Sequence, residues 1–204
     1  MTTERLLPKI ILALDVDGVV NAFTKNSRKL ESGQIAEWPI KWRPPMIERL
    51  KAVLALPNVE GAWLTTWLQS PALLDELEEL LGLKGYVPHR AEYPFMVELG
   101  WGGAKVLADE RFTGSSLNVG NPRWWKFRSA QFLVEDLKPD RFAWIDDELG
   151  SAKGIPNDIW KPVNSYDKLL MRTHSIAALL PEDLDKIEAW VAAPPPDNLG
   201  INHG

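Results

Sequence analysis

The sequence lacks cysteine entirely and has no apolar run long enough to span a membrane. Disulfide bonds and cysteine-ligated zinc sites are therefore excluded. The apolar stretch near the N-terminus is short and is interrupted by Pro8, Lys9 and Asp15, so it does not have the form of a signal peptide. We therefore expect a soluble, cytoplasmic protein that has no membrane partner.

Hydrophobic residues make up 45% of the 204-residue chain and charged residues 25%, a balance typical of one globular domain. We place this domain at residues 1–193 and expect the proline-rich tail, 194–204, to be disordered. The formal net charge of −5 argues against a protein that coats nucleic acid by charge alone, although a local basic patch is compatible with it. The sequence carries no signal for a particular oligomeric state.

Strand-like and helix-like segments alternate along the chain. Continuous apolar runs are typical of strands buried on both faces of a parallel sheet, whereas apolar residues three and four apart indicate amphipathic helices. The expected strands are 9–16, 60–67, 141–150 and 167–173, and the expected helices are 43–58, 70–83, 125–140 and 181–193. This alternation predicts an α/β fold, a Rossmann-like parallel sheet between two helix layers.

Two segments do not follow the alternation. Residues 21–43 separate the first strand from its helix, and residues 84–123 are rich in glycine, proline and aromatic residues. Both are longer than ordinary connections, so we expect functional loops or small caps there rather than a large separate cap domain.

Acidic and hydroxyl side chains stand at the ends of three expected strands. They are Asp15 with Asp17, Thr65 with Thr66, and Asp146 with Asp147. Ligands bind at the carboxyl edge of open parallel sheets, so these side chains are expected to meet there. Four carboxylates at one edge would repel one another, and a divalent cation that prefers oxygen ligands, most plausibly Mg²⁺, would relieve that repulsion.

Such an arrangement suits the chemistry of phosphoryl transfer. A carboxylate beside Mg²⁺ can attack phosphorus, and a second carboxylate two residues on can act as general acid and base. A hydroxyl and a lysine would hold the phosphoryl oxygens and offset their charge.

Four segments resemble, in the right order, the motifs of the haloacid dehalogenase (HAD) superfamily: LDVDGVVN, WLTTW, the lysine of WWKF, and WIDDE. The resemblance covers residues 9–192, with the two insertions least well matched. The chain looks most similar to small HAD-like proteins of actinobacteria and their phages. Those proteins are related to the HAD domains of multifunctional RNA-repair proteins.

The resemblance implies a role for each matching residue. Asp15 would be the nucleophile and would become an aspartyl phosphate. Asp17 would be the general acid and base, with its main-chain carbonyl on Mg²⁺. Thr65 would bind the phosphoryl group, and Thr66, its neighbour, is the second choice for that role.

A lysine and the final acid pair complete the implied site. Lys126 would stabilise the charge of the nucleophile and of the phosphoryl group. Lys105 is its rival, but the helix of Lys126 leads directly into the strand that ends in the acid pair. Of Asp146 and Asp147, one would bind Mg²⁺ directly or through water, and the other would orient the metal shell or the lysine.

Because an acid follows the nucleophile by two residues, the resemblance implies a Mg²⁺-dependent phosphohydrolase. Its phosphorylated substrate would be a nucleotide or a nucleic-acid end, by the relationship to RNA repair. Two alternatives are a phosphatase of small metabolites such as sugar phosphates, and a non-catalytic phosphate-binding or regulatory protein.

Small, aromatic and basic residues near the implied site are candidates for substrate contact. Direct contact is assigned to Thr65, Thr66, Gly18 and Trp67. Tryptophans that can stack on a base, unless they pack in the core, are Trp67, Trp101, Trp124 and Trp125. Basic residues that can meet phosphates, unless they form a solvated loop face, are Lys25, Arg28, Lys29, Lys41 and Arg43.

Overall fold

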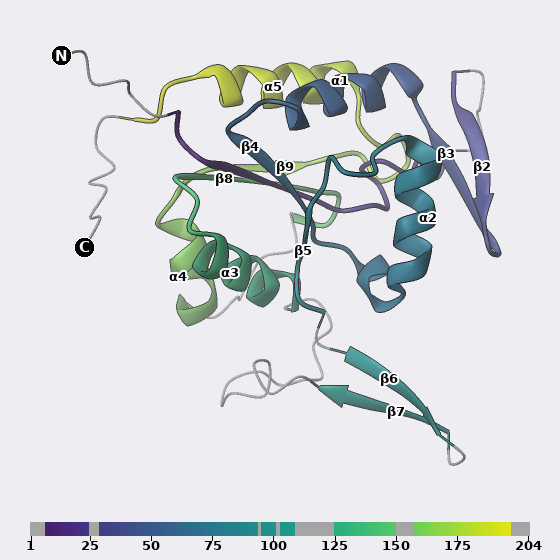
Figure 1. Cartoon of the computed structure of the whole chain (residues 1–204). Coiled ribbons are helices and arrows are strands. Elements are labelled where there is room, and N and C mark those ends of the chain that lie inside the picture. The colour runs from purple at the N-terminus through teal and green to yellow at the C-terminus, as the bar shows by residue number, and fades with distance from the viewer. Residues whose placement is uncertain are drawn as a thin grey trace.

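Five parallel strands form one sheet at the centre of the molecule, in the order β5-β4-β1-β8-β9 (Figure 1). Their bounds are Ile10–Leu14 (β1), Val59–Trp63 (β4), His89–Arg90 (β5), Arg141–Asp146 (β8) and Asp167–Arg172 (β9). Every residue of β1 is buried, as its uninterrupted apolar run predicts for a strand covered on both faces. The structure is a computed structural model that describes residues 7–24, 29–93, 95–100, 103–108, 125–149 and 157–196. Only the backbone is described for residues 95–100, 103–108 and 157–160.

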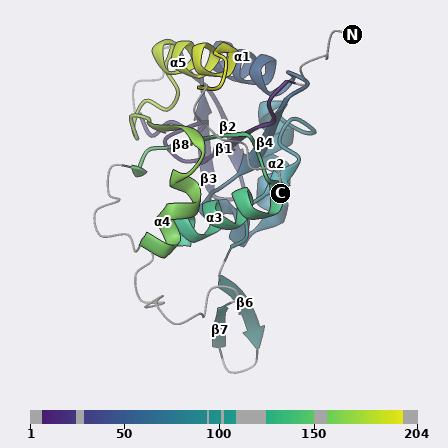
Figure 2. The same cartoon turned by 90° about the vertical axis from the view of Figure 1, so that its left-hand side faces the viewer.

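Helices cover both faces of this sheet. α1 (Pro44–Leu54) and α5 (Pro181–Ala192) lie side by side on one face (Figures 1 and 2). α3 (Trp125–Leu137) and α4 (Asn157–Asn164) lie together on the other. Arg49 of α1 donates to Glu188 of α5 at 2.8 Å, and this bond joins the two helices. The predicted α/β fold with two helix layers is therefore confirmed.

The helix boundaries follow from local sequence. Prolines occupy the first turns of α1, α5 and α2 (Pro71–Leu81), where an N–H would have no partner within the helix. Gly82 ends α2 in the left-handed conformation, with φ 65°. A short 3₁₀ helix, η1 (Thr66–Gln69), connects β4 to α2.

Two antiparallel hairpins lie outside the central sheet. β2 (Glu31–Ile35) and β3 (Trp38–Trp42) pair within the first predicted insertion, and β6 (Phe95–Gly100) and β7 (Gly103–Ala108) pair within the second. Gly33 of β2 lies against Leu80 of α2, so close that a Cβ there would be 2.9 Å from the leucine side chain. The β2–β3 hairpin thus packs on α2 as a small cap element.

Several expected boundaries differ from the structure. The second strand ends at Trp63, so Thr65 and Thr66 follow it instead of closing it. The hairpins and α4 were not predicted as elements, and α4 contains an internal proline, Pro162. The limits of the domain, 1–193, and the disorder of the tail stay predictions, and residues 197–204 lie outside the described part. Among the described helices, none is both long and apolar enough to cross a membrane.

The strand order reverses between β1 and β8. From β1 the chain moves to β4 and β5 on one side, then crosses to β8 and β9 on the other. Parallel sheets bind ligands outside the carboxyl ends of the strands at such a reversal. Asp15 follows β1 directly, and Asp146 is the last residue of β8.

Candidate active site

Asp15 stands at the reversal point and is held there by the backbone. Its amide N–H donates to the carbonyl of Ile145 on β8 at 3.0 Å, which continues the strand pairing by one residue. Its side chain is 4% exposed. Oδ1 accepts from the Val16 N–H at 2.7 Å, and Oδ2 accepts from the Lys126 ammonium. A buried carboxylate therefore stands at the strand reversal with one oxygen on a cation.

Lys126 reaches this carboxylate from the first turn of α3. Its Nζ also donates to Asp146 Oδ2 at 2.8 Å, and the residue is 8% exposed. Burial disfavours the ammonium form, but Asp15 and Asp146 outweigh it and raise the pKa of Lys126 above its ordinary value. The lysine is therefore a fixed positive charge between two acids. The rival, Lys105, lies on β7, where only the backbone is described.

Three carboxylates converge on this point. One oxygen from each of Asp15, Asp146 and Asp147 lies within 4.8 Å of the other two. Burial, opposed by the charge of Lys126 and reinforced by that of Asp146, raises the pKa of Asp15 from 3.8 to about 7. Burial first, then the charges of Asp146 and Glu148, raise the pKa of Asp147. One ammonium does not neutralise three acids, and an all-oxygen donor set of this kind fits a hard divalent cation such as Mg²⁺.

Gly18 allows the loop after β1 to approach the final acid pair. Its φ is +72°, and a Cβ at this position would lie 2.6 Å from Cγ of Asp147. The Thr173 hydroxyl, just beyond β9, donates to the Gly18 carbonyl at 2.6 Å. Only glycine combines this backbone conformation with this contact. Thr173 was missed in the sequence, where nothing marks a threonine after the last strand as a partner of this loop.

Asp17 lies beside the three-acid cluster but has different partners. Oδ1 accepts from Asn21 Nδ2 at 2.8 Å, and Oδ2 accepts from the indole N–H of Trp67 at 3.0 Å. Both oxygens of the carboxylate are therefore engaged. Asn21 was not assigned a role from the sequence, although it is the last residue of the DVDGVVN segment.

Thr65 and Thr66 differ in burial and in their contacts with the acids. Thr65 is fully buried, and a hydrogen bond from its side chain to Asp15 helps to lower the pKa of that acid. The Thr65 hydroxyl also accepts from the Trp67 N–H at 3.3 Å, which caps η1. Thr66 begins η1 and is exposed. Of the two, Thr65 is the one brought to the acids.

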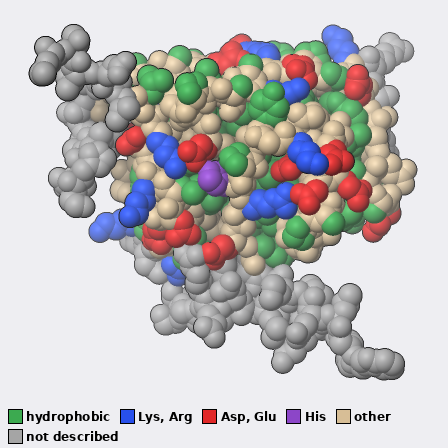
Figure 3. All heavy atoms as spheres, viewed as in Figure 1, with side chains coloured by type: hydrophobic (Ala, Val, Ile, Leu, Met, Phe, Trp, Pro, Cys, Tyr) green, Lys and Arg blue, Asp and Glu red, His purple; other side chains and the backbone are tan. Residues whose placement is uncertain are grey.

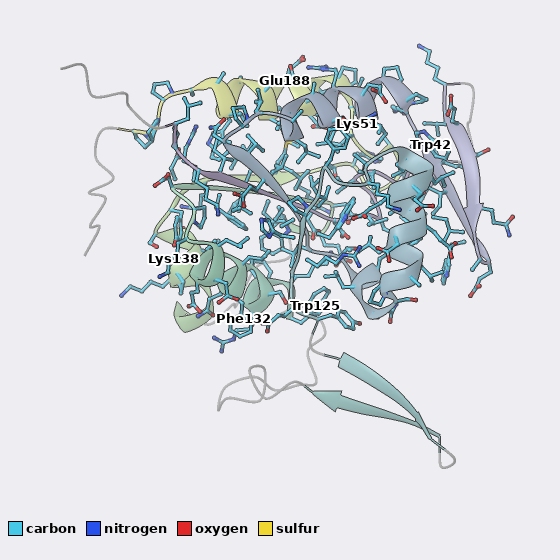
Figure 4. All side chains as sticks on the ribbon, viewed as in Figure 1. Trp42, Lys51, Trp125, Phe132, Lys138 and Glu188 are labelled. Atoms are coloured by element: carbon cyan, nitrogen blue, oxygen red, sulfur yellow. The ribbon has the colours of Figure 1, made fainter. Side chains whose placement is uncertain are left out.

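The described tryptophans near the site are buried. Trp67 is 9% exposed and Trp125 is 7% exposed. Trp125, at the start of α3, packs edge-on against Tyr93, with ring centroids 4.9 Å apart (Figure 4). Neither ring offers an open face on which a base can stack. Trp101 and Trp124 lie outside the described residues, as do Lys25 and Arg28.

Lys41 of β3 contacts the loop that carries Asp17, and Arg43 follows β3 as the N-cap of α1. The Lys41 N–H donates to Asn21 Oδ1 at 3.0 Å, and the Lys41 carbonyl accepts from the Ala22 N–H at 2.8 Å. The Lys41 ammonium donates to the carbonyl of Thr24 at 3.0 Å. Nε of Arg43 is buried and has no partner among the residues described. Lys29 is exposed.

One family model matches most of the chain. The model of the HAD domain in Swiss Army Knife RNA repair proteins matches residues 11–184. That range runs from β1 into α5 and includes each residue predicted for the site. No curated protein sequence matches the chain.

Proposed function

We propose, from the premise that this chain belongs to the family of HAD domains in Swiss Army Knife RNA repair proteins, that it is a Mg²⁺-dependent phosphohydrolase. The family is one of phosphatase-type hydrolases. The observation that supports the proposal most is the setting of Asp15, a buried carboxylate bonded to Lys126 and Thr65 at the strand reversal. Phosphoryl transfer requires a nucleophile, a positive charge and a hydroxyl donor placed in this way.

In the first step, an Asp15 oxygen attacks the phosphorus and the ester bond to the substrate breaks. The departing oxygen takes a proton from Asp17, and an aspartyl phosphate remains. In the second step, Asp17 takes a proton from water while the water oxygen attacks the phosphorus. The P–O bond to Asp15 breaks, and inorganic phosphate leaves. Lys126 balances negative charge on Asp15 and on the phosphoryl oxygens in both steps.

Asp15, Asp146 and Asp147 would hold the Mg²⁺, together with the main-chain carbonyl of Asp17 that the superfamily resemblance implies. When bound, the cation offsets the charge of the phosphoryl group and aligns it with the nucleophile. Burial first, and then the charge of Asp146, raise the pKa of Asp15, and a bound cation would offset both and keep Asp15 ionised near neutral pH.

For the substrate we propose a nucleotide or a phosphorylated nucleic-acid end. Lys41 and Arg43 support this choice, because no carboxylate pairs with either cation within the described part of the chain. The Lys41 N–H donates to Asn21, which bonds to Asp17, and Arg43 follows Lys41 by two residues. On the face shown in Figure 3, basic side chains are interspersed with acidic ones and form no continuous stripe. That face therefore offers no continuous basic track for a nucleic acid.

A phosphatase screen tests the proposal. Wild-type protein and Asp15→Asn would be assayed with Mg²⁺ on an aryl phosphate, nucleotides, phosphorylated oligonucleotides and sugar phosphates. We expect the wild-type protein to turn over phosphate esters, and we expect chelation of Mg²⁺ to abolish this activity. Asp15→Asn should be inactive. Oligonucleotides or nucleotides should be preferred to sugar phosphates. Turnover that survives chelation, or that Asp15→Asn retains, would refute the proposed chemistry. A preference for sugar phosphates would refute the proposed substrate alone.

A further inference from the structure

The Asp17 carboxylate is bonded at both oxygens by donors from two different elements. Asn21 belongs to the loop after β1, whereas Trp67 belongs to η1, beyond β4. A carboxylate on a loop, with one donor or none, can turn about its side-chain bonds. Two donors on separate elements fix the plane and direction of the group.

The Trp67 indole is held rigidly enough to act as such a donor. Trp67 is 9% exposed and belongs to the hydrophobic core. Its main-chain N–H donates to the Thr65 hydroxyl at 3.3 Å. Thr65 in turn bonds to Asp15. One short segment therefore supplies a hydroxyl to the first acid and an N–H to the second. An indole N–H can only donate, so this contact requires an acceptor oxygen on Asp17.

Asn21 carries a second constraint, from the β2–β3 hairpin. Its Oδ1 accepts from the Lys41 N–H, and its Nδ2 donates to Asp17, so the amide bridges the two. Ala22 and Lys41 are also joined through their backbones. The orientation of the amide is consequently set by the position of β3.

We propose that Trp67 and Asn21 are positioning residues for Asp17, and that the hairpin acts on Asp17 through Asn21. This proposal rests on the proposed function, because it concerns the proton that Asp17 gives to the leaving group. A misaligned acid slows the departure of a basic alkoxide strongly. It hardly affects a leaving group that departs without protonation.

The test compares two substrates in Trp67→Phe, which deletes the N–H and keeps most of the ring packing. One substrate is an alkyl phosphate such as a nucleoside 5′-phosphate, and the other is dinitrophenyl phosphate, whose leaving group needs no proton. We expect kcat/KM to fall by about tenfold or more for the alkyl ester, part of the 10²–10⁴-fold that acid–base catalysis is worth. For the aryl ester we expect a change within about threefold.

The matched control is Trp63→Phe. The Trp63 indole N–H donates to buried Glu78 at 2.7 Å, so this variant also loses one bond from an indole to a carboxylate. It should leave unchanged the ratio of kcat/KM for the alkyl ester to kcat/KM for the aryl ester. Asn21→Leu should lower this ratio, as Trp67→Phe does. In crystals of Trp67→Phe, the Asp17 side chain should occupy more than one rotamer.

An equal fall for both substrates in Trp67→Phe, or no change in the ratio, would overturn the positioning role while leaving the proposed function intact. Wild-type turnover that does not depend on Asp15 would overturn both. The two failures are therefore distinguishable from the same set of measurements.

Discussion

Replacing Lys126 by methionine removes the only positive charge that the structure places among the buried acids of the described site. Lys126 donates to both Asp15 and Asp146, and all three residues are less than one-tenth exposed. Breaking a buried ion pair from one side leaves an uncompensated charge, which costs about 3–5 kcal/mol. Methionine fills much of the same volume, so the loss would come from charge and not from a cavity.

The loss should depend on pH in a defined direction. The pKa of Asp15 is already raised from 3.8 to about 7, so its ionisation lowers the stability of the fold as pH rises through that window. Without Lys126 the pKa of Asp15 rises further, because the lysine lowers it in the wild type. The destabilisation of Lys126→Met should thus be largest near about pH 8 and clearly smaller near about pH 5, where Asp15 is protonated.

Urea unfolding followed by tryptophan fluorescence would measure this effect, with Lys84→Met as the control. Lys84 pairs with Glu79, but its side chain is 70% exposed, so its loss should hardly change stability. Mg²⁺ at about 100 times its Kd should restore about 2.7 kcal/mol to any variant that still binds it. The reasoning is refuted if Lys126→Met unfolds like Lys84→Met at about pH 8, or if its destabilisation does not change with pH.

Other substitutions and conditions probe the loop after β1, the metal and the substrate. Gly18→Ala should cost about 1–2 kcal/mol of stability, measured by denaturation, because alanine disfavours the left-handed backbone of Gly18. It should also lower kcat/KM in steady-state kinetics, because the new Cβ would lie 2.6 Å from Asp147. Mg²⁺ affinity, measured by calorimetry, should fall about tenfold per pH unit below the Asp15 pKa of about 7, because the metal must displace a proton. Arg43→Ala should lower kcat/KM for a phosphorylated oligonucleotide more than for an aryl phosphate, and rising salt should erase that difference.

The central sheet and the acid pairs were predictable because each depends on a strong local pattern. The run Ile10–Leu14 is apolar throughout, which only a strand covered on both faces explains well. Asp15 and Asp146 then follow from strand ends that must meet at one edge of a parallel sheet. Lys126 was assigned from the resemblance to the HAD motifs and was preferred to Lys105 because its helix leads directly into the strand that ends in the final acids.

The hairpin and the partners of Asp17 were not predictable, because they depend on tertiary contacts. β2 has the sequence ESGQI, which is mostly polar and has little apolar alternation, so it gives no strand signal by itself. Its position is set by contact with α2 through Gly33. A tryptophan in WLTTW looks equally suited to stacking or to the core, and only the folded structure directs its N–H toward Asp17. Thr173 and Asn21 likewise gain their roles from loops that fold onto each other.

Trapping the phosphorylated protein tests the central claim most directly. Asp17→Asn would be mixed with Mg²⁺ and an aryl phosphate, quenched in acid, and analysed by peptide mass spectrometry. Because the proposed mechanism has Asp17 activate the water of the second step, this variant should turn over about 10²–10⁴-fold more slowly and accumulate a phosphoryl group on the peptide that contains Asp15. Asp15→Asn should give neither adduct nor turnover. Hydrolysis that proceeds without any adduct on Asp15, or at a near-normal rate in Asp15→Asn, would contradict the account.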